Sequence, residues 1–302
     1  MDCCKLVTYN NIIINNLLSS NLLEWDSDID KFNPYDNEVI TTKKIFKHKG
    51  TLFSFYHNKL EVLIKPHYLH NNNLHNANNF KIKDCIKVIN NIKTTFNIDL
   101  REFKVVNIEF GINVISPIPI NELLAYIIYH EKNEFRNDKL PYCKLSYKPT
   151  KCGKQNQYKI IKVYAKGIQY PQYCDKNTLR FEVKSKESKY IKTLGINSAN
   201  DLLNEYVHYT LYSKILNEFN KLLILDCHTD FKKLNIKDQK KIEKFNNPIE
   251  WYKIYNSAYR NSFINNKNIY YRLIDKVENN LKNVLLEIFK SKIKFLIDEN
   301  IN

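Results

Sequence analysis

The stretch Tyr158–Lys184 reads YKIIKVYAKGIQYPQYCDKNTLRFEVK and predicts two strands joined by a loop. Within each strand, apolar residues recur at every second position, which is typical of a sheet that has one face in a core. The residues between them are polar and would share the opposite face: Lys162, Tyr164, Lys166, Arg180, Glu182 and Lys184.

A third segment, VVNIEFGINV at residues 105–114, alternates in the same way and places Glu109 among its polar positions. If the three strands share one sheet, one surface carries two carboxylates, a tyrosine, an arginine and several lysines. This inventory is unusual for a merely solvated face, so the hypothesis of function starts from it.

The composition is that of a folded protein whose partners carry negative charge. The chain has 302 residues, of which 43% are hydrophobic, and its 47 basic and 32 acidic residues give a net charge of +15. This length allows one large domain or two. The excess of basic residues favours polyanions, through phosphate contacts and counterion release.

Features of membrane and secreted proteins are missing from the sequence. No apolar run approaches the roughly 20 residues that span a bilayer. The N-terminus MDCCKLVTYNN has no basic segment followed by an apolar one. The seven cysteines show no CxxC spacing, which fits reduced thiols better than a disulfide framework. We therefore expect a cytoplasmic protein without membrane association.

The first hundred residues are predicted to mix strands, loops and helices. A strand and a short helix fit residues 5–25, and several strands fit residues 43–65. The polar residues 26–38 predict a loop between them. The stretch PHYLHNNNLHNANNF at 66–80 shows no period and predicts another loop. Apolar residues at three- and four-residue spacing then predict an amphipathic helix over 82–96.

Beyond about residue 235 the pattern is wholly helical and ends in the basic stretch LKNVLLEIFKSKIKFLID. The chain therefore predicts an α+β fold, mainly an antiparallel sheet packed by helices. Residues 1–235 would form the α+β core and residues 236–302 a helical, basic C-terminal region. This region would serve DNA docking, oligomerisation or simply packing of the core.

Two carboxylates, Glu109 and Glu182, come from separate predicted strands, each between apolar neighbours. Converging carboxylates can hold Mg²⁺ or Mn²⁺, which prefer oxygen ligands and phosphate co-ligands. Alternatively, each carboxylate pairs with a lysine or an arginine across the sheet. The residues leave both interpretations open.

Four tyrosines crowd the same stretch: Tyr158, Tyr164, Tyr170 and Tyr173. A tyrosine can act as a covalent nucleophile, although most of the 21 tyrosines in the chain must serve packing or the surface. Basic residues that could neutralise a phosphate lie beside them: Lys162, Lys166, Arg180 and Lys184. A solvated basic face is the alternative interpretation of these cations.

The three histidines within 66–80 suggest a metal but lack the paired spacing of a structural zinc site. His67 and His70 would share a face only in a helix, and Pro66 with the asparagine run argues against one. The nearest further ligands for zinc are Cys143, Cys152 and Cys174. No Walker A, GxGxxG or GxSxG motif supports nucleotide-driven or α/β-hydrolase chemistry.

Three stretches, in this order, resemble strands of the rolling-circle replication initiators of filamentous phages and certain plasmids. NIEFGINV looks like the family's acidic strand, KIIKVYAKG like its Tyr-Asp-Lys strand and TLRFEVKSK like its Arg-x-Glu strand. The segment YIKTLGINSANDLLN follows as a helix does there, and the 66–80 stretch lies where the family has its substrate loop. The likeness covers about residues 60–235. It departs at Asn107, where arginine is usual, at Ala165, where an acid is common, and in lacking a His-hydrophobic-His triplet.

Such initiators nick one DNA strand through a tyrosine, with a divalent metal that polarises the scissile phosphate. The resemblance implies Glu109 and Glu182 as ligands of that metal, and Tyr164, or its neighbour Tyr158, as the nucleophile. The contacts to phosphate and nucleic acid that it implies, including a catalytic one from Lys166, come from Lys162, Lys166, Arg180, Lys184, His75 and Asn76.

The sequence therefore indicates a DNA-binding replication initiator of a phage, plasmid or other mobile element. Such a protein is a metal-dependent endonuclease that nicks and joins single-stranded DNA or an origin hairpin. Transesterification keeps the phosphodiester energy in a tyrosyl–DNA link, consistent with the lack of an ATP motif. The alternatives are a non-catalytic nucleic-acid-binding protein on the same fold, and a structural protein whose charge reflects base composition.

Overall fold

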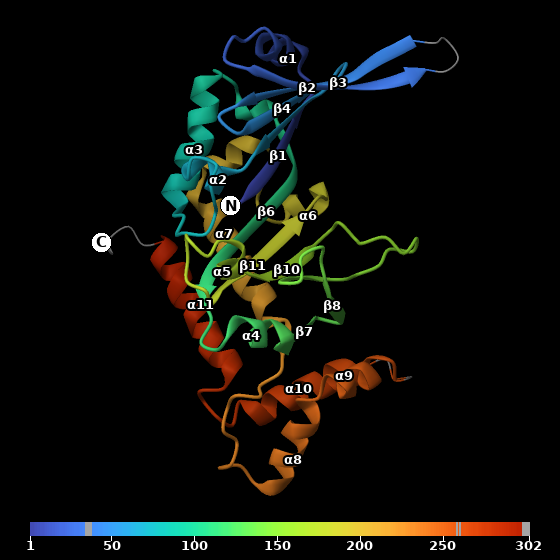
Figure 1. Cartoon of the computed structure of the whole chain (residues 1–302), viewed down its shortest axis with the longest axis vertical. Coiled ribbons are helices and arrows are strands. Elements are labelled where there is room, and N and C mark those ends of the chain that lie inside the picture. The colour runs from blue at the N-terminus through green and yellow to red at the C-terminus, as the bar shows by residue number, and fades with distance from the viewer. Residues whose placement is uncertain (34–37, 258, 260, 298–302) are drawn as a thin grey trace. The chain divides into compact units, whose positions relative to one another are not determined.

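The computed structural model describes residues 1–33, 38–257, 259 and 261–297, and they form an α+β fold (Figure 1). Helices and strands are mixed along the chain as far as residue 224, and helices alone follow in the described residues. The fold class predicted from the sequence is confirmed.

The strands form one antiparallel sheet. They are β1 (Cys3–Thr8), β2 (Glu24–Asn33), β3 (Glu38–His48), β4 (Thr51–Phe55), β5 (Leu60–Ile64), β6 (Lys104–Ile115), β7 (Ile127–His130), β8 (Asn133–Asn137), β9 (Cys143–Ser146), β10 (Ile160–Ala165), β11 (Thr178–Ser185) and β12 (Leu222–Ile224). Their order is β12-β7-β8-β9-β10-β11-β6-β1-β5-β4-β3-β2. The three strands from which the sequence interpretation started, β6, β10 and β11, are therefore neighbours.

The helices are short to medium in length. They are α1 (Asn11–Leu18), α2 (Pro66–His70), α3 (Ile82–Thr95), α4 (Ile120–Tyr126), α5 (Lys166–Gln169), α6 (Ser188–Lys192), α7 (Glu205–Asn220), α8 (Ile236–Phe245), α9 (Pro248–Tyr255), α10 (Ser262–Ile274) and α11 (Leu281–Ile297), with 3-10 turns η1 (Leu100–Glu102) and η2 (Ala199–Leu203). Within the described ranges, none of them has the length and apolar character of a membrane-crossing helix.

The chain forms two compact units. The first consists of Met1–Gly111, Gln157–Lys159 and Val183–Tyr212, and the second of Ile112–Asn156, Ile160–Glu182 and Ser213–Asn302. Strands β6 and β11 and helix α7 contribute residues to both units. The division at residue 235 that the sequence suggests remains a prediction, whereas the helical character of the C-terminal region is confirmed for its described residues.

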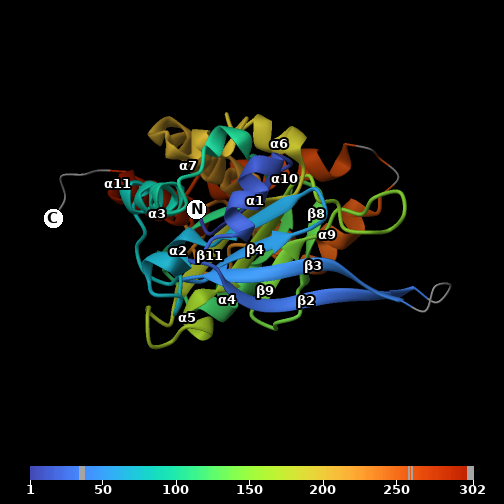
Figure 2. The ribbon, with the colours of Figure 1, turned by 90° about the horizontal axis from the view of Figure 1, so that it is seen from above.

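In the first unit, β2 is the outermost strand and lies beside β3, which in turn pairs with β4 (Figure 2). The loop predicted over residues 26–38 is wrong for the part that β2 occupies, and its residues 34–37 lie outside the described ones. Polar side chains of β2 pair across to β3: Lys47 with Asp26, and Thr41 with Asp30, whose oxygens are 2.7 Å apart. A charged edge strand has the composition of a loop because it leaves most of its side chains in water.

The loop predicted over 66–80 begins instead with helix α2. Pro66 occupies the first turn, where its missing N–H is no loss and its fixed φ suits a helix. Pro66 and the asparagine run were taken to argue against a helix here, and for residues 66–70 this interpretation was wrong. The helix predicted over 82–96 is α3, and its apolar stripe is buried: Ile82, Cys85, Ile89 and Ile92.

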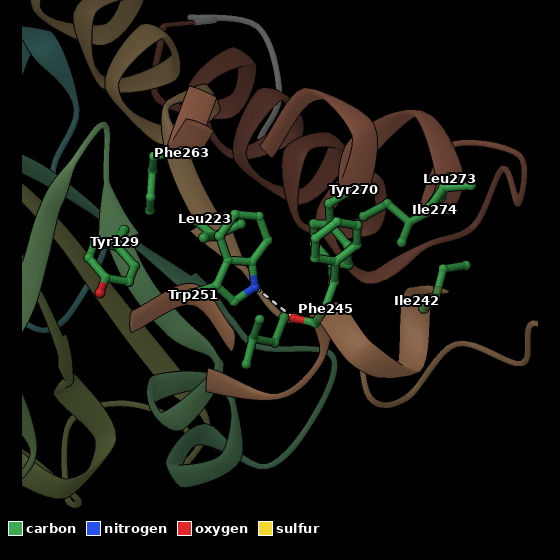
Figure 3. Packing of buried hydrophobic residues seen from close by; sticks show 10 residues of the cluster. Tyr129, Leu223, Ile242, Phe245, Trp251, Phe263, Tyr270, Leu273 and Ile274 are labelled. Atoms are coloured by element: carbon green, nitrogen blue, oxygen red, sulfur yellow. Dashed lines mark hydrogen bonds between the residues drawn. The ribbon is translucent and has the colours of Figure 1, made fainter. Parts of the chain in front are cut away.

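In the second unit, helices α8–α10 enclose an aromatic core (Figure 3). Trp251 is fully buried, and its Nε1 donates to the Phe245 carbonyl at 2.6 Å. The Phe245 ring stacks on it at 5.3 Å, and Tyr270 and Phe263 meet it edge to face. Trp251 thus supplies packing within this unit.

A second layer of aromatic packing lies beneath β11. Phe219 of α7 and Phe289 of α11 stack with ring centres 4.3 Å apart, and Phe181 of β11 meets both edge to face. These contacts hold two helices against the apolar face of β11, so its other face is left for the polar residues.

Candidate active site

Strand β10 places the predicted nucleophile. Ile161, Val163 and Ala165 are fully buried, as the alternation predicts, and Lys162 and Tyr164 therefore lie on the opposite face. Tyr164 is itself only 7% exposed. The polar face of the strand is consequently an interior surface at this point.

Strand β11 is buried on both faces along most of its length. Leu179, Phe181 and Val183 lie in the core, while the charged residues Arg180 and Glu182 are only 2% and 3% exposed. Burying a charge is costly unless the group is paired and hydrogen-bonded. These two residues therefore need the partners that the structure gives them.

The Glu182 carboxylate is the centre of a hydrogen-bond cluster. Tyr164 Oη donates to Glu182 Oε1 at 2.7 Å, and Arg180 Nε donates to the same oxygen at 3.1 Å. Lys162 Nζ lies 3.7 Å from Glu182 Oε2. Arg180 Nη1 also donates to Asn113 Oδ1 of β6 at 3.0 Å. The carboxylate thus accepts hydrogen bonds from a phenol and a guanidinium, and it forms an ion pair with a lysine.

Lys166 is the second buried cation of the cluster, and it lies in a different element from the one predicted. Instead of extending β10, it opens the one-turn helix α5. Gly167 allows this turn, because a Cβ there would lie only 2.3 Å from the Asp175 carbonyl oxygen. The strand prediction at Lys166 is wrong because alternation cannot reveal such a close backbone approach.

The Lys166 ammonium is held between oxygens and aromatic rings. Its Nζ donates to Gln169 Oε1 at 2.8 Å and lies 3.5 Å from Tyr164 Oη. It lies 5.1 Å from the ring centre of Tyr164 and 4.7 Å from that of Tyr170, within cation–π range. Lys166 is fully buried, so its position is closely defined.

This arrangement suits nucleophilic chemistry on a phosphate. A carboxylate that accepts the hydrogen bond of a hydroxyl is placed to remove its proton, which is how a weak nucleophile is activated. Arginine and lysine side chains at the same point can stabilise the charge of a phosphoryl group. Of the predicted site residues, the structure brings together Tyr164, Lys166, Arg180, Glu182 and Lys162.

Glu109 belongs to the first unit and forms an ion pair there with Lys184. It lies opposite Cys3 in the ladder between β1 and β6. Burial, followed by the nearby Glu109 carboxylate, raises the pKa of the Cys3 thiol to about 12. Glu109 and Glu182 thus each have a cationic partner, as the cross-sheet alternative proposed, and their metal role stays a prediction.

The other predicted site residues also lie in the first unit. Tyr158 precedes β10, is 39% exposed and meets the Tyr190 ring edge to face at 5.2 Å. His75 and Asn76 are buried in the segment after α2. Asn76 Nδ2 donates to Asp2 Oδ1 at 3.4 Å, so this segment is tied to the N-terminal strand.

Sequence reasoning missed a buried pair in the first unit, Asp2 and His67. Their Oδ1 and Nδ1 atoms are 3.6 Å apart, and both side chains are almost fully buried. His67 Nε2 bonds Asn78 Oδ1 at 2.8 Å, and the Phe80 ring stacks on the imidazole. No periodic pattern includes Asp2, so only the abundance of histidine in the segment pointed here.

A group that could hold a metal ion is present in the second unit: His130, Glu131 and Glu218 offer ligand atoms within 4.8 Å of one another. His130 Nε2 lies 2.8 Å from Glu218 Oε2. Lys221 Nζ lies 3.1 Å from a carboxylate oxygen of Glu131 and 3.1 Å from one of Glu218. The Lys221 ammonium therefore neutralises the two carboxylates in the way that a bound metal ion would.

The His130 group and Tyr164 occupy different places in the sheet of the second unit. His130 ends β7, and β8 and β9 separate this strand from β10. Three strand spacings of about 4.8 Å amount to roughly 14 Å. One ion bound by His130 would therefore not reach a phosphate at Tyr164.

No protein-family model matches the chain, and no curated protein matches it either. A solved structure similar to it is the "Structure of Rolling Circle Replication Initiator Protein from Geobacillus stearothermophilus". The two chains share 9% sequence identity, with a TM-score of 0.42, over 77% of this chain and 88% of that chain.

Proposed function

We propose that this protein is a DNA replication initiator of a phage or mobile element, which nicks and joins single-stranded DNA through Tyr164. The observation that carries the proposal is the 2.7 Å hydrogen bond from Tyr164 Oη to the buried Glu182 carboxylate, with Lys166 and Arg180 beside it. The net charge of +15 supports a nucleic-acid substrate.

In the proposed reaction, Glu182 accepts the phenolic proton as the Tyr164 oxygen bonds to phosphorus. The P–O3′ bond breaks, and the 3′ oxygen leaves with a proton that the Lys166 ammonium donates. The 5′ phosphate remains on Tyr164 as a phosphodiester, so the reverse reaction rejoins the strand without ATP. Arg180 stabilises the added charge on phosphorus.

A divalent ion, Mg²⁺ or Mn²⁺, would polarise a non-bridging oxygen of the phosphate. Glu109 and Glu182 are the ligands proposed from the sequence. The His130 group offers an imidazole and two carboxylates, a donor set that suits Mn²⁺ better than Mg²⁺, but it is too far from Tyr164 to hold this ion and would bind a separate one. Lys162, Lys184, His75 and Asn76 are proposed to contact the DNA strand.

The proposal is tested by incubating a labelled single-stranded oligonucleotide, or an origin hairpin, with the protein and Mn²⁺. Wild type should cleave it and retain label through denaturing electrophoresis. Tyr164→Phe should retain none, whereas Tyr252→Phe, which removes a hydroxyl from a side chain 63% exposed in α9, should behave as wild type. Equal labelling of the wild type and Tyr164→Phe would refute the role of Tyr164.

A non-catalytic nucleic-acid-binding protein is the second candidate. The observation that favours it is the saturation of Glu182, which accepts from Tyr164 and Arg180 and pairs with Lys162. Such a network can simply hold β10 to β11. In that case wild type binds DNA with strong salt dependence and never cleaves it with either metal.

A further inference from the structure

A polar pocket of about 480 Å³ lies wholly within the first unit. Its walls come from the end of β3 and the turn after it, the segment after α2, and the C-terminal half of α3. This volume falls in the range of small-molecule sites. None of the residues that line the pocket belongs to the Tyr164 cluster.

Left-handed backbone conformations gather at this pocket. Lys49, Asn72 and Asn73 have φ values of 46°, 53° and 65°, and all three line it. Asn73 Nδ2 donates to the Lys49 carbonyl at 3.1 Å. Its amide packs so closely on Gly50 that a Cβ there would lie 2.2 Å from Asn73 Oδ1. Two loops distant in sequence are therefore locked together, as at pre-organised binding sites.

Position 49 is occupied by lysine, although the geometry of its turn favours asparagine. Lys49 and Gly50 join the paired residues His48 and Thr51, and both have positive φ, which is the type I′ hairpin geometry. Asparagine followed by glycine is the sequence preferred in this turn. The chain uses asparagine freely elsewhere but has lysine here. In the part of the chain that the structure describes, the Lys49 ammonium is in no ion pair, so its charge is available to a ligand.

Away from Lys49, the pocket wall suits a planar and polar group without negative charge. The amides of Asn72 and Asn91 and the Thr95 hydroxyl present both donors and acceptors. The His48 and Phe96 rings, 5.0 Å apart and edge to face, supply aromatic surface. Helix α3 ends at Thr95, and the partial negative charge of a helix C-terminus disfavours an anion at this wall.

We propose that this pocket binds a single nucleobase, stacked against Phe96 and hydrogen-bonded by the asparagine amides, with its phosphate at the exposed Lys49. A nucleobase combines a π-face with a polar edge, which are the two features that the walls offer. The same chemistry is presented by an unpaired base of single-stranded DNA and by a free nucleotide. The proposal does not rest on cleavage at Tyr164.

The test measures fluorescence anisotropy of the full chain with single-stranded oligonucleotides that are intact or carry one abasic residue at successive positions. Loss of one stacked base should weaken wild-type binding by about 10-fold at one position. Asn91→Ala with Thr95→Val should bind the intact and abasic oligonucleotides equally. Asn90→Ala, which alters an exposed neighbour in α3, should keep the wild-type preference.

Lys49→Asn restores the preferred turn sequence, so it should fold at least as well as wild type and yet bind the intact oligonucleotide several-fold more weakly. Lys44→Gln, which removes the same charge from β3, should show a smaller loss. A parallel titration with dAMP and dTMP tests whether the pocket binds a free nucleotide. Binding of either nucleotide by wild type and not by the Asn91→Ala/Thr95→Val variant would support this source of the ligand. The proposal is overturned if wild type shows no abasic preference and binds neither nucleotide, or if the pocket variants match wild type in both arms.

Discussion

Replacing Glu182 with glutamine perturbs the centre of the Tyr164 cluster while nearly preserving its shape. Arg180 and Glu182 are 2% and 3% exposed, so the substitution leaves a buried guanidinium beside a neutral amide. Breaking a buried ion pair by removing one partner costs about 3–5 kcal/mol. Glutamine keeps an oxygen that accepts from Tyr164, so we expect the lower end, about 3 kcal/mol.

A loss of this size corresponds to a melting temperature lower by about 9 °C, at roughly 3 °C per kcal/mol for a chain of this size. Differential scanning calorimetry would measure the change. The matched control is Lys162→Met, because its ammonium is 3.7 Å from the carboxylate and the side chain is 24% exposed. Such a partly exposed pair contributes about 0–1 kcal/mol.

The expected order is therefore a large shift for Glu182→Gln and a shift of about 3 °C or less for Lys162→Met. A Glu182→Gln protein that melts within about 2 °C of wild type would refute the reasoning, since the buried carboxylate would then contribute little net stability. Equal melting-temperature shifts in Glu182→Gln and Lys162→Met would refute the reasoning as well. They would mean that the loss of stability comes from the changed net charge and not from the burial of the ion pair.

Three further outcomes follow from other parts of the chain. Burial lowers the pKa of His208 from 6.5 to about 4. Because the unfolded chain binds more protons in this range, the free energy of unfolding should fall by about 3 kcal/mol between pH 6.5 and pH 4. Urea titrations should show a weaker fall for His208→Gln. Trp251→Ala should lose about 3–5 kcal/mol in chemical denaturation, and Trp251→Phe about 1–2 kcal/mol, because the indole is fully buried and bonded to Phe245. Mn²⁺ should raise the melting temperature of wild type and not that of Glu218→Gln. The control is Glu134→Gln, because Glu134 is an exposed residue of β8. Equal Mn²⁺ shifts in all three proteins would exclude the His130 group as the metal site.

Periodicity predicted the parts of the fold that depend on local pattern. The strands that contain Glu109, Tyr164 and Glu182, and the amphipathic helix α3, were all recognisable from spacing. A period of two residues tells which side chains share a face but not what covers that face. The burial of Arg180 and Glu182 depends on segments distant in sequence, so a surface expected to be polar proved to be interior.

The other differences between the sequence pattern and the structure also have physical causes. Strand β2 was taken for a loop because an edge strand can be as polar as one. Lys166 was placed on a strand because the close approach of the Asp175 carbonyl to Gly167 leaves no pattern in the sequence. The candidate metal group of His130 and Glu218 joins residues 88 positions apart, a distance over which spacing carries no information.

The central claim is that Tyr164 forms a covalent bond to DNA. The most direct measurement is mass spectrometry of the protein after reaction with a single-stranded oligonucleotide and Mn²⁺, followed by nuclease trimming and peptide mapping. The proposal predicts a nucleotide phosphate on the peptide that contains Tyr164 and its loss in Tyr164→Phe. A nucleotide on any other tyrosine, Tyr158 included, or no adduct on any origin sequence tested, would contradict it.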